Sequence, residues 1–117
     1  MKQEKWFLLQ EWVADELKDI DPYARSTKQS GGGSEKGDVR NSCGLNCECK
    51  CYNTKSPYQE KWLAKCQEEI PLHSDKIAIV VTENCEGKKR VHIDANDFFE
   101  MFKGFRKYYN PDEGCNT

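Results

Sequence analysis

The segment KGDVRNSCGLNCECKC, residues 36–51, joins a turn to a run in which thiol and larger polar side chains alternate. Side chains of a β-strand alternate between its two faces with a period of two residues. A strand over residues 46–52 therefore separates two sets of side chains: Cys47, Cys49 and Cys51 on one face, and Asn46, Glu48, Lys50 and Tyr52 on the other. Because a buried cysteine behaves as a small hydrophobic residue, we expect the cysteine face to be buried.

Asp38 precedes this strand and follows a glycine-rich turn, from which it can reach Glu48 and Lys50. Two carboxylates beside a lysine suit a hard divalent metal ion and the phosphate chemistry that it supports. Taken alone, Asp38 also fits an ordinary turn. Glu48 and Lys50 alone also fit a solvated strand face, where an ion pair contributes little to stability.

The length of 117 residues is that of one domain with a modest core. Hydrophobic residues make up 37% and charged residues 32%, and no apolar run approaches the ~20 residues of a membrane helix. The first residues do not form a signal peptide, so we expect a cytoplasmic protein without a membrane partner. A net charge of −2 argues mildly against nucleic acid as a partner, although a cluster of carboxylates that binds Mg²⁺ itself lowers the charge.

Seven cysteines, an odd number, argue against a disulfide framework and for a reducing compartment. Four of them raise a zinc site as an alternative: Cys43, Cys47, Cys49 and Cys51. Structural zinc sites usually contain pairs of cysteines two to four residues apart, with a second pair further along the chain. The spacing here fits the alternation of a strand better than such a pair.

The chain predicts an α/β fold, a mixed sheet with helices on its faces. The expected elements are a helix over 3–19, a short strand within 22–29, a strand over 45–52, a helix from Ser56-Pro57 to Pro71, strands over 76–82 and 90–93, and a helix over 95–108. Residues 1–109 form the expected single domain, and residues 110–117 a loose tail.

Apolar residues in the first helix form so wide an arc that we expect this helix to be well buried. Gln10 and Glu16 fall on its buried side, whereas Glu11 points towards the polar side. We expect the aromatic residues of the last helix to lie mostly in the core.

This order of elements, with these residues, resembles the PD-(D/E)XK nuclease superfamily, and within it the small archaeal and phage Holliday junction resolvases. The resemblance spans about residues 5–103 and rests on Gly37-Asp38-Val39 followed by Glu48-Cys49-Lys50, with Ser30-Gly31-Gly32 before the acid. The E-x-K pattern alone is a frequent chance match. An acid, a strand-borne E-x-K and a helix on either side are more specific. The implied fold is a restriction-endonuclease-like core.

The resemblance implies a role for each matching residue. Asp38, Glu48 and the backbone carbonyl of Cys49 bind Mg²⁺, for which Mn²⁺ can substitute, and Lys50 positions the attacking water and stabilises charge on the phosphate. The family places a glutamate on the first helix where this chain has Gln10, so Glu11 or Glu16 takes that role if the helix is rotated. A proline often precedes the family's first acid, where this chain has Gly37.

The resemblance also implies partners. The implied substrate is DNA, above all a four-way junction cut by a homodimer, with the last helix and the strand over 77–82 as candidate interfaces. Basic and loop residues flank the site and are candidate DNA contacts: Arg25, Lys28, Ser30, Gly31, Lys36, Arg40 and Lys55. If the source is a phage, the compartment is the host cytoplasm. The alternatives are a nicking or restriction-like nuclease of the same superfamily, and a non-enzymatic zinc-stabilised interaction module.

Overall fold

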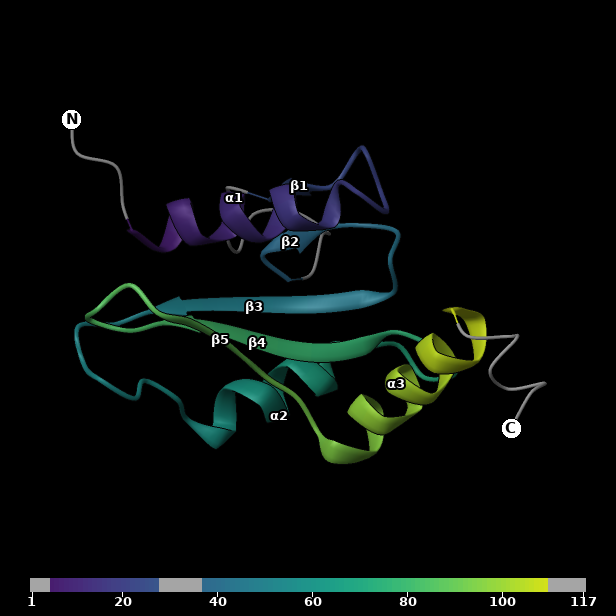
Figure 1. The fold of residues 1–117 in the computed structure, drawn as a ribbon. Coiled ribbons are helices and arrows are strands. Elements are labelled where there is room, and N and C mark those ends of the chain that lie inside the picture. Colours follow the sequence, from purple (N-terminus) through teal and green to yellow (C-terminus); the bar gives the residue numbers. More distant parts are fainter. Residues whose placement is uncertain (1–4, 28–36, 110–117) are drawn as a thin grey trace.

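The computed structural model describes residues 5–27 and 37–109 (Figure 1). Its helices and strands follow the order expected from the sequence: α1 (Lys5–Leu17), β1 (Arg25–Ser26), β2 (Val39–Arg40), β3 (Leu45–Cys51), α2 (Glu60–Glu68), β4 (Ile77–Glu83), β5 (Lys89–His92) and α3 (Ala95–Tyr109). The protein therefore has the mixed α/β architecture that the pattern predicts. The expected loose tail, residues 110–117, lies outside the described residues.

The main sheet has three strands in the order β3-β4-β5. β3 pairs with β4 in parallel, with Glu48 opposite Val80, and α2 lies between these strands in the chain as the crossover. β5 pairs with β4 antiparallel. β1 and β2 form a separate antiparallel pair. β3 is thus an edge strand of the main sheet, and the chain around β2 approaches its outer edge (Figure 1).

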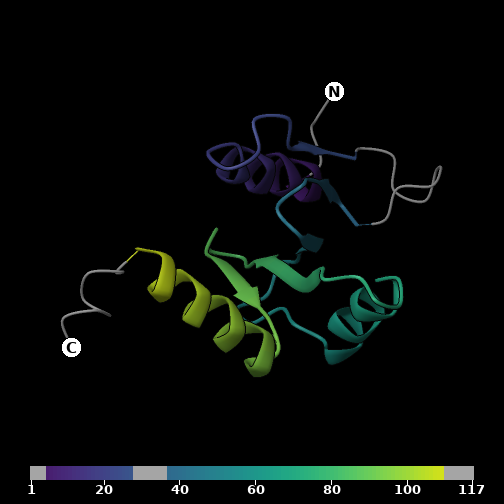
Figure 2. The ribbon, with the colours of Figure 1, turned by 90° about the vertical axis from the view of Figure 1, so that its right-hand side faces the viewer.

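Helices cover both faces of this sheet (Figures 1 and 2). One cluster joins α1 to the odd-numbered strand residues: Leu9, Val13, Ala14, Val39, Cys47, Cys49, Ile79 and Val81. The other joins α2 to the even-numbered residues of β4: Trp62, Leu63, Cys66, Ala78 and Val80. The burial of the cysteine face is therefore confirmed for Cys47 and Cys49, whereas Cys51, at the end of β3, is only partly buried. Since β4 is covered on both faces, the prediction that the strand over 77–82 is an interface is wrong.

α1 is less buried than its sequence predicts. Leu9, Val13 and Ala14 lie in the core, but the rest of the apolar arc is exposed: Trp6, Leu8, Trp12 and Ile20. Glu16 is also exposed, so its placement on the buried side is wrong. The physical reason is the small partner surface, because a three-stranded sheet accepts one stripe of the helix and leaves the flanks in solvent.

α3 also departs from the prediction. Its aromatic residues were expected in the core, yet the large apolar side chains that the structure describes up to residue 107 are about half exposed: Phe98, Phe99, Met101, Phe102 and Phe105. Figures 1 and 2 show why: α3 follows β5 and runs beyond the outer edge of the sheet, away from α1 and α2. No described element covers its apolar face.

α2 begins later than Ser56-Pro57. Its first residue is Glu60, and its N-cap residue, Gln59, makes no side-chain capping bond. Pro57 is buried, and the ring of Tyr58 packs on His92 and against Trp62, which fixes these residues as extended chain before the helix. Within residues 5–27 and 37–109, no helix has the length and apolar character needed to cross a membrane.

Candidate active site

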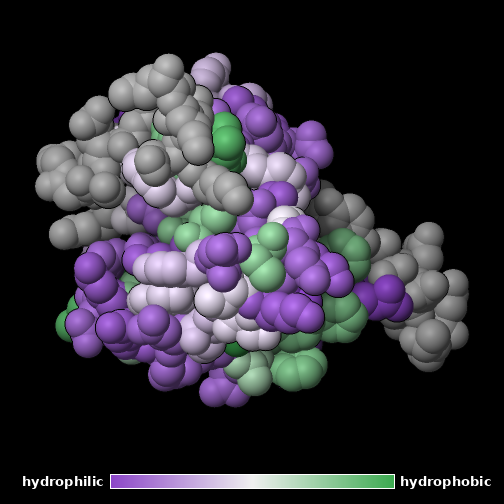
Figure 3. Space-filling model, turned by 90° about the vertical axis from the view of Figure 1, so that its left-hand side faces the viewer, coloured by the Kyte–Doolittle hydropathy of each residue, from purple (hydrophilic) through white to green (hydrophobic). Residues whose placement is uncertain are grey.

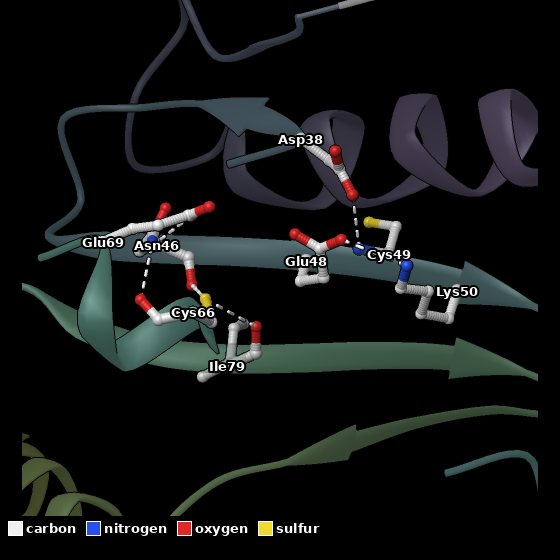
Figure 4. A network of polar contacts seen from close by, with 8 residues as sticks. All are labelled: Asp38, Asn46, Glu48, Cys49, Lys50, Cys66, Glu69 and Ile79. Carbon is white, nitrogen blue, oxygen red and sulfur yellow. Dashed lines mark hydrogen bonds and ion pairs between the residues drawn. The ribbon is translucent and has the colours of Figure 1, made fainter. Parts of the chain in front are cut away.

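Asp38 is fixed on the outer edge of β3 by two backbone hydrogen bonds. Its N–H donates to the carbonyl oxygen of Cys47 over 2.7 Å. Its Oδ2 accepts the N–H of Cys49 over 2.7 Å (Figure 4). The carboxylate is therefore tied to the strand that carries Glu48 and Lys50. This is the arrangement that the sequence spacing predicts.

Gly37 makes this approach possible. Its φ is +81°, and a Cβ atom there would collide with the side chain of Asn46 and lie 3.1 Å from the carbonyl oxygen of Cys47. Glycine adopts positive φ without steric cost, whereas proline is fixed near −65°. The absence of a proline before the acid, one of the departures from the family pattern, thus has a local structural reason.

Glu48 and Lys50 lie side by side on the other face of β3 from the cysteines. Lys50 Nζ is 3.4 Å from Glu48 Oε2, and both side chains are mostly buried. The same Nζ lies 5.4 Å from the centre of the Trp62 ring, within the range of a cation–π contact. The ammonium group is therefore fixed between a carboxylate and an aromatic face.

These side chains line one pocket of about 340 Å³, together with residues of α1: Trp6, Gln10, Asp38, Glu48, Cys49, Lys50, Cys51 and Tyr52. Figure 3 shows the face of the molecule that lies at the left of Figure 1, where hydrophilic and near-neutral side chains lie next to each other. Gln10 is 2% exposed, so its predicted place on the buried side of the helix is confirmed. Glu11 is exposed and lines a different pocket beside Lys18 and Arg25. Gln10, not Glu11 or Glu16, is thus the polar residue of α1 that reaches the site.

Burial is the main cause that raises the pKa of the Asp38 and Glu48 carboxyl groups, and Lys50 opposes the shift at both. Repulsion from the Asp38 carboxylate raises the pKa of Glu48 further. Glu69, just after the end of α2, adds to the negative field at both groups. The pocket thus concentrates negative charge in a partly desolvated place. A bound cation would relieve that repulsion.

The donors in the pocket fit a hard metal ion. Besides two carboxylates, Gln10 lines the pocket, and its Oε1 is buried and has no hydrogen-bond partner among the described residues. A buried acceptor without a partner costs about 1–3 kcal/mol, which a bound cation would offset. The N–H and carbonyl of a strand residue face the same edge, so the carbonyl of Cys49 points to the edge where Asp38 lies. Mg²⁺ prefers oxygen ligands and often uses only one or two carboxylates.

The cysteines do not form a comparable site. Cys47 and Cys49 lie in the core against α1, and burial raises the pKa of Cys47 to about 12 and raises the pKa of Cys49 as well. In the described part of the chain, no three His, Cys, Asp or Glu residues are grouped so that they could hold a metal ion. A metal site here therefore depends on the amide and backbone oxygens as well as the carboxylates.

The predicted DNA contacts fall in several places. Arg25 and Arg40 face each other across the β1–β2 pair and are exposed. Lys55 is exposed in the loop after β3, where its carbonyl accepts a hydrogen bond from Asn84 Nδ2 over 3.1 Å. None of these three lines the pocket of Asp38. The remaining four candidates lie outside the described residues: Lys28, Ser30, Gly31 and Lys36.

Several residues that surround the site had no role in the sequence prediction. Trp6 and Tyr52 line the pocket, and a signal for both existed: Trp6 precedes Gln10 by one helical turn, and Tyr52 continues the Glu48–Lys50 face. Asn46 Nδ2 donates to the carbonyl of Cys66 over 2.8 Å and to Glu69 Oε1 over 3.4 Å (Figure 4). Neither local spacing nor periodicity could reveal contacts between residues that lie about twenty positions apart.

Comparison of the chain with protein-family models, with curated proteins and with solved structures finds no match. The resemblance to PD-(D/E)XK nucleases therefore rests on the residues of this chain alone. A function for the chain has to be inferred from the pocket and its contacts.

Proposed function

We propose that the protein is a divalent-metal-dependent endonuclease with a restriction-endonuclease-like core, which hydrolyses phosphodiester bonds in DNA. The observation that supports this most strongly is one pocket lined by Asp38, Glu48, Lys50 and Gln10, whose buried Oε1 has no hydrogen-bond partner within the described part of the chain. Two carboxylates, a buried amide oxygen and a lysine are a donor set for a hard cation and a phosphate.

Asp38, Glu48 and Gln10 Oε1 would hold Mg²⁺, with the carbonyl of Cys49 beside them. When bound, the ion polarises a phosphate oxygen and makes an attacking water more acidic. Mn²⁺ would substitute because it takes the same oxygen ligands. Gln10 supplies the neutral oxygen where the family has a carboxylate, so the site carries one negative charge fewer.

Lys50 has a defined place in this chemistry. Its ammonium group is fixed by Glu48 on one side and by the Trp62 ring on the other, so it needs little reorganisation when a phosphate enters. A fixed cation aimed at the pocket stabilises negative charge that develops on the phosphate oxygens. The hydrogen bond from Cys49 N–H orients Asp38 in the same way before any ligand arrives.

The preferred substrate is a four-way junction cut by a homodimer, because symmetric cuts in two strands need two sites. α3 is the interface of this dimer. Its apolar residues recur every three or four positions along one stripe: Ala95, Phe98, Phe102 and Phe105. The acids Asp97 and Glu100 lie in its first half and the bases Lys103, Arg106 and Lys107 in its second half. An antiparallel pair of α3 helices therefore aligns opposite charges, whereas a parallel pair aligns like charges.

The dimer is tested by sedimentation of Phe102→Glu beside Leu72→Glu. Both residues are exposed apolar residues, but Leu72 lies in the loop before β4. The wild type and Leu72→Glu should sediment as dimers and Phe102→Glu as a monomer. A wild-type monomer at the concentrations used for cleavage contradicts the interface.

We place this activity in the cytoplasm, which is the host cytoplasm for a phage protein. The described cysteines are free thiols, as a reducing compartment maintains them.

The direct test is cleavage of a labelled four-way junction in Mg²⁺, beside a linear duplex of the same sequence, by the wild type and by Lys50→Ala. Paired symmetric cuts in the junction alone, lost in the variant, would support the proposal. Equal cutting of both substrates would leave a nicking or restriction-like nuclease without junction preference. No cutting of either by the folded protein would contradict the proposal.

A further inference from the structure

We infer that Tyr52 and Trp6 form a stacking site for one unpaired nucleobase beside the phosphate that is cut, so that the enzyme selects DNA with an unstacked nucleotide at that point. This inference rests on the proposed function, because the carboxylates and Lys50 of the same pocket define where the phosphate lies. It adds a binding role for two aromatic residues that the catalytic set does not use.

The ring of Tyr52 packs against the protein on one face, and much of its remaining surface is exposed. Its ring stacks on Trp62 with the two rings 5.4 Å apart and only 6° from parallel. Trp62 is 9% exposed and is itself packed against Tyr58 and Lys50. Tyr52, in contrast, is 48% exposed and lines the pocket. One face of the Tyr52 ring is therefore fixed against Trp62, and the surface of Tyr52 that is exposed and lines the pocket belongs to the rest of the ring.

Trp6 supplies a second aromatic surface from a different element. It lies on α1, is 37% exposed, and lines the same pocket as Tyr52. Its ring packs edge to face on Phe7 at 6.0 Å. The carboxylates and Lys50 therefore share their pocket with aromatic rings from α1 and from the end of β3. The volume of about 340 Å³ is at the lower end of small-ligand sites, which suits one base rather than a base pair.

An aromatic ring stacks on a base only if that base is free of its neighbours. Bases within a duplex are already stacked and paired, so removing one costs free energy, and the cost is least where the nucleotide is already unpaired. Stacking on tyrosine or tryptophan tolerates any sequence, since every base presents a π-face. The pocket therefore selects structure rather than sequence: a flap, a single strand, or a junction whose base pairs open at the crossover.

The test compares two single strands with equal numbers of phosphates: a thymidine pentamer and a pentamer of the abasic sugar-phosphate. Affinities are measured by calorimetry with Ca²⁺ in place of Mg²⁺, since the looser coordination of Ca²⁺ permits binding while cleavage is slow. The variants are Tyr52→Ala, Tyr52→Leu and Tyr52→Phe. Tyr23→Ala is the matched control, because Tyr23 is 86% exposed and outside the pocket. Thermal melting checks that each variant folds.

We expect the wild type to bind the thymidine pentamer about tenfold more tightly than the abasic pentamer. Tyr52→Phe and Tyr23→Ala should keep this preference. Tyr52→Ala should lose it, and so should Tyr52→Leu, which retains apolar packing on Trp62 but offers no ring face. Equal wild-type affinity for the two pentamers, or a preference that survives in Tyr52→Leu, would overturn the inference.

Cleavage separates this inference from the proposed function. If the wild type cuts DNA in Mg²⁺ but binds both pentamers equally, the stacking site is wrong and the nuclease stands. If the preference depends on Tyr52 but no DNA is cut, the stacking site stands and the nuclease is wrong.

Discussion

The two faces of β3 have opposite characters, although they belong to one strand of seven residues. Cys47 and Cys49 face α1 in an apolar cluster that contains no charged side chain. Glu48 and Lys50 face the other way and line a pocket with Asp38, where burial raises the pKa of both carboxyl groups. The cysteine face stabilises the fold, whereas the charged face costs stability, which is the usual sign of a functional site.

The coverage of the two faces explains the difference. On the cysteine side, α1 covers the strand with Leu9, Val13 and Ala14. On the other side, α2 covers Asn46 with the carbonyl of Cys66 but leaves Glu48 and Lys50 at the pocket. A substitution should therefore affect activity on one face and stability on the other.

The largest expected effect is that of Glu48→Ala. It should lower the rate of Mg²⁺-dependent cleavage by at least about 1,000-fold, because losing a metal ligand removes several kcal/mol of transition-state stabilisation. Folding should be preserved, since one of two repelling carboxylates is removed. Initial rates and thermal melting measure the two effects. Glu86→Ala, in the exposed turn before β5, is the control and should cleave as the wild type does.

Gln10→Glu tests whether the uncharged side chain at position 10 lies at a metal site, because it adds a third carboxylate to the pocket of Asp38 and Glu48. Without metal, a third carboxylate in this buried place should lower the free energy of unfolding by about 2–3 kcal/mol. Mg²⁺ should restore most of the loss, since the ion then meets three carboxylates. Urea unfolding in chelator and in Mg²⁺ measures both values. Glu11→Gln, on the same helix but outside the pocket, is the control, and its change in the free energy of unfolding should be the same in chelator and in Mg²⁺. If Mg²⁺ does not restore the free energy of unfolding that Gln10→Glu loses, no metal binds at this position.

Cys47→Ser probes the apolar face. Cys47 is fully buried, so a hydroxyl group without a partner should lower the free energy of unfolding by about 1–2 kcal/mol. Cleavage at low temperature should be unchanged, because this side chain faces away from the pocket. Cys85→Ser is the control, since Cys85 is exposed and should tolerate the change. Loss of cleavage in a stably folded Cys47→Ser protein would contradict the separation of the two faces.

The smallest expected effect is the pH dependence of stability without metal. The pKa values of Asp38 and Glu48 are raised in the folded protein by burial, so the folded state binds protons more tightly than the unfolded state. Their contribution favours folding at low pH and is lost as the pH rises through the folded pKa. His92, whose pKa burial lowers, acts in the opposite direction. Comparing the wild type with Glu48→Gln isolates the carboxyl effect: the variant should lose less stability as the pH rises, and identical pH profiles would contradict the assignment.

Much of the site's arrangement could be predicted because it depends on local periodicity. The two-residue period of a strand separates Cys47 and Cys49 from Glu48 and Lys50, and the helical period places Gln10 on the buried stripe of α1. The same periodicity failed for Trp12, Glu16 and the phenylalanines of α3. It identifies an apolar face but not whether another element covers that face. Three strands are too few to cover both faces of α1 or the whole apolar face of α3.

Other features depend on contacts between distant parts of the chain. No local sequence pattern indicates that Tyr52 stacks on Trp62 or that Asn46 contacts Glu69. The same is true of the start of α2 at Glu60, three residues after Pro57. The spacing of Asp38 and Glu48 predicted that they could meet. The close approach that brings them together depends on the positive φ of Gly37.

Whether the carboxylates bind the metal is decided by Mg²⁺ titration in a calorimeter of the wild type and of the Asp38→Asn, Glu48→Gln double variant, with the metal content of both proteins determined beforehand. We expect one Mg²⁺ per wild-type chain, no Mg²⁺ bound by the folded double variant, and no stoichiometric zinc in either protein. Stoichiometric zinc that persists in the double variant, with loss of the fold on chelation, would contradict the account and assign the metal to the cysteines.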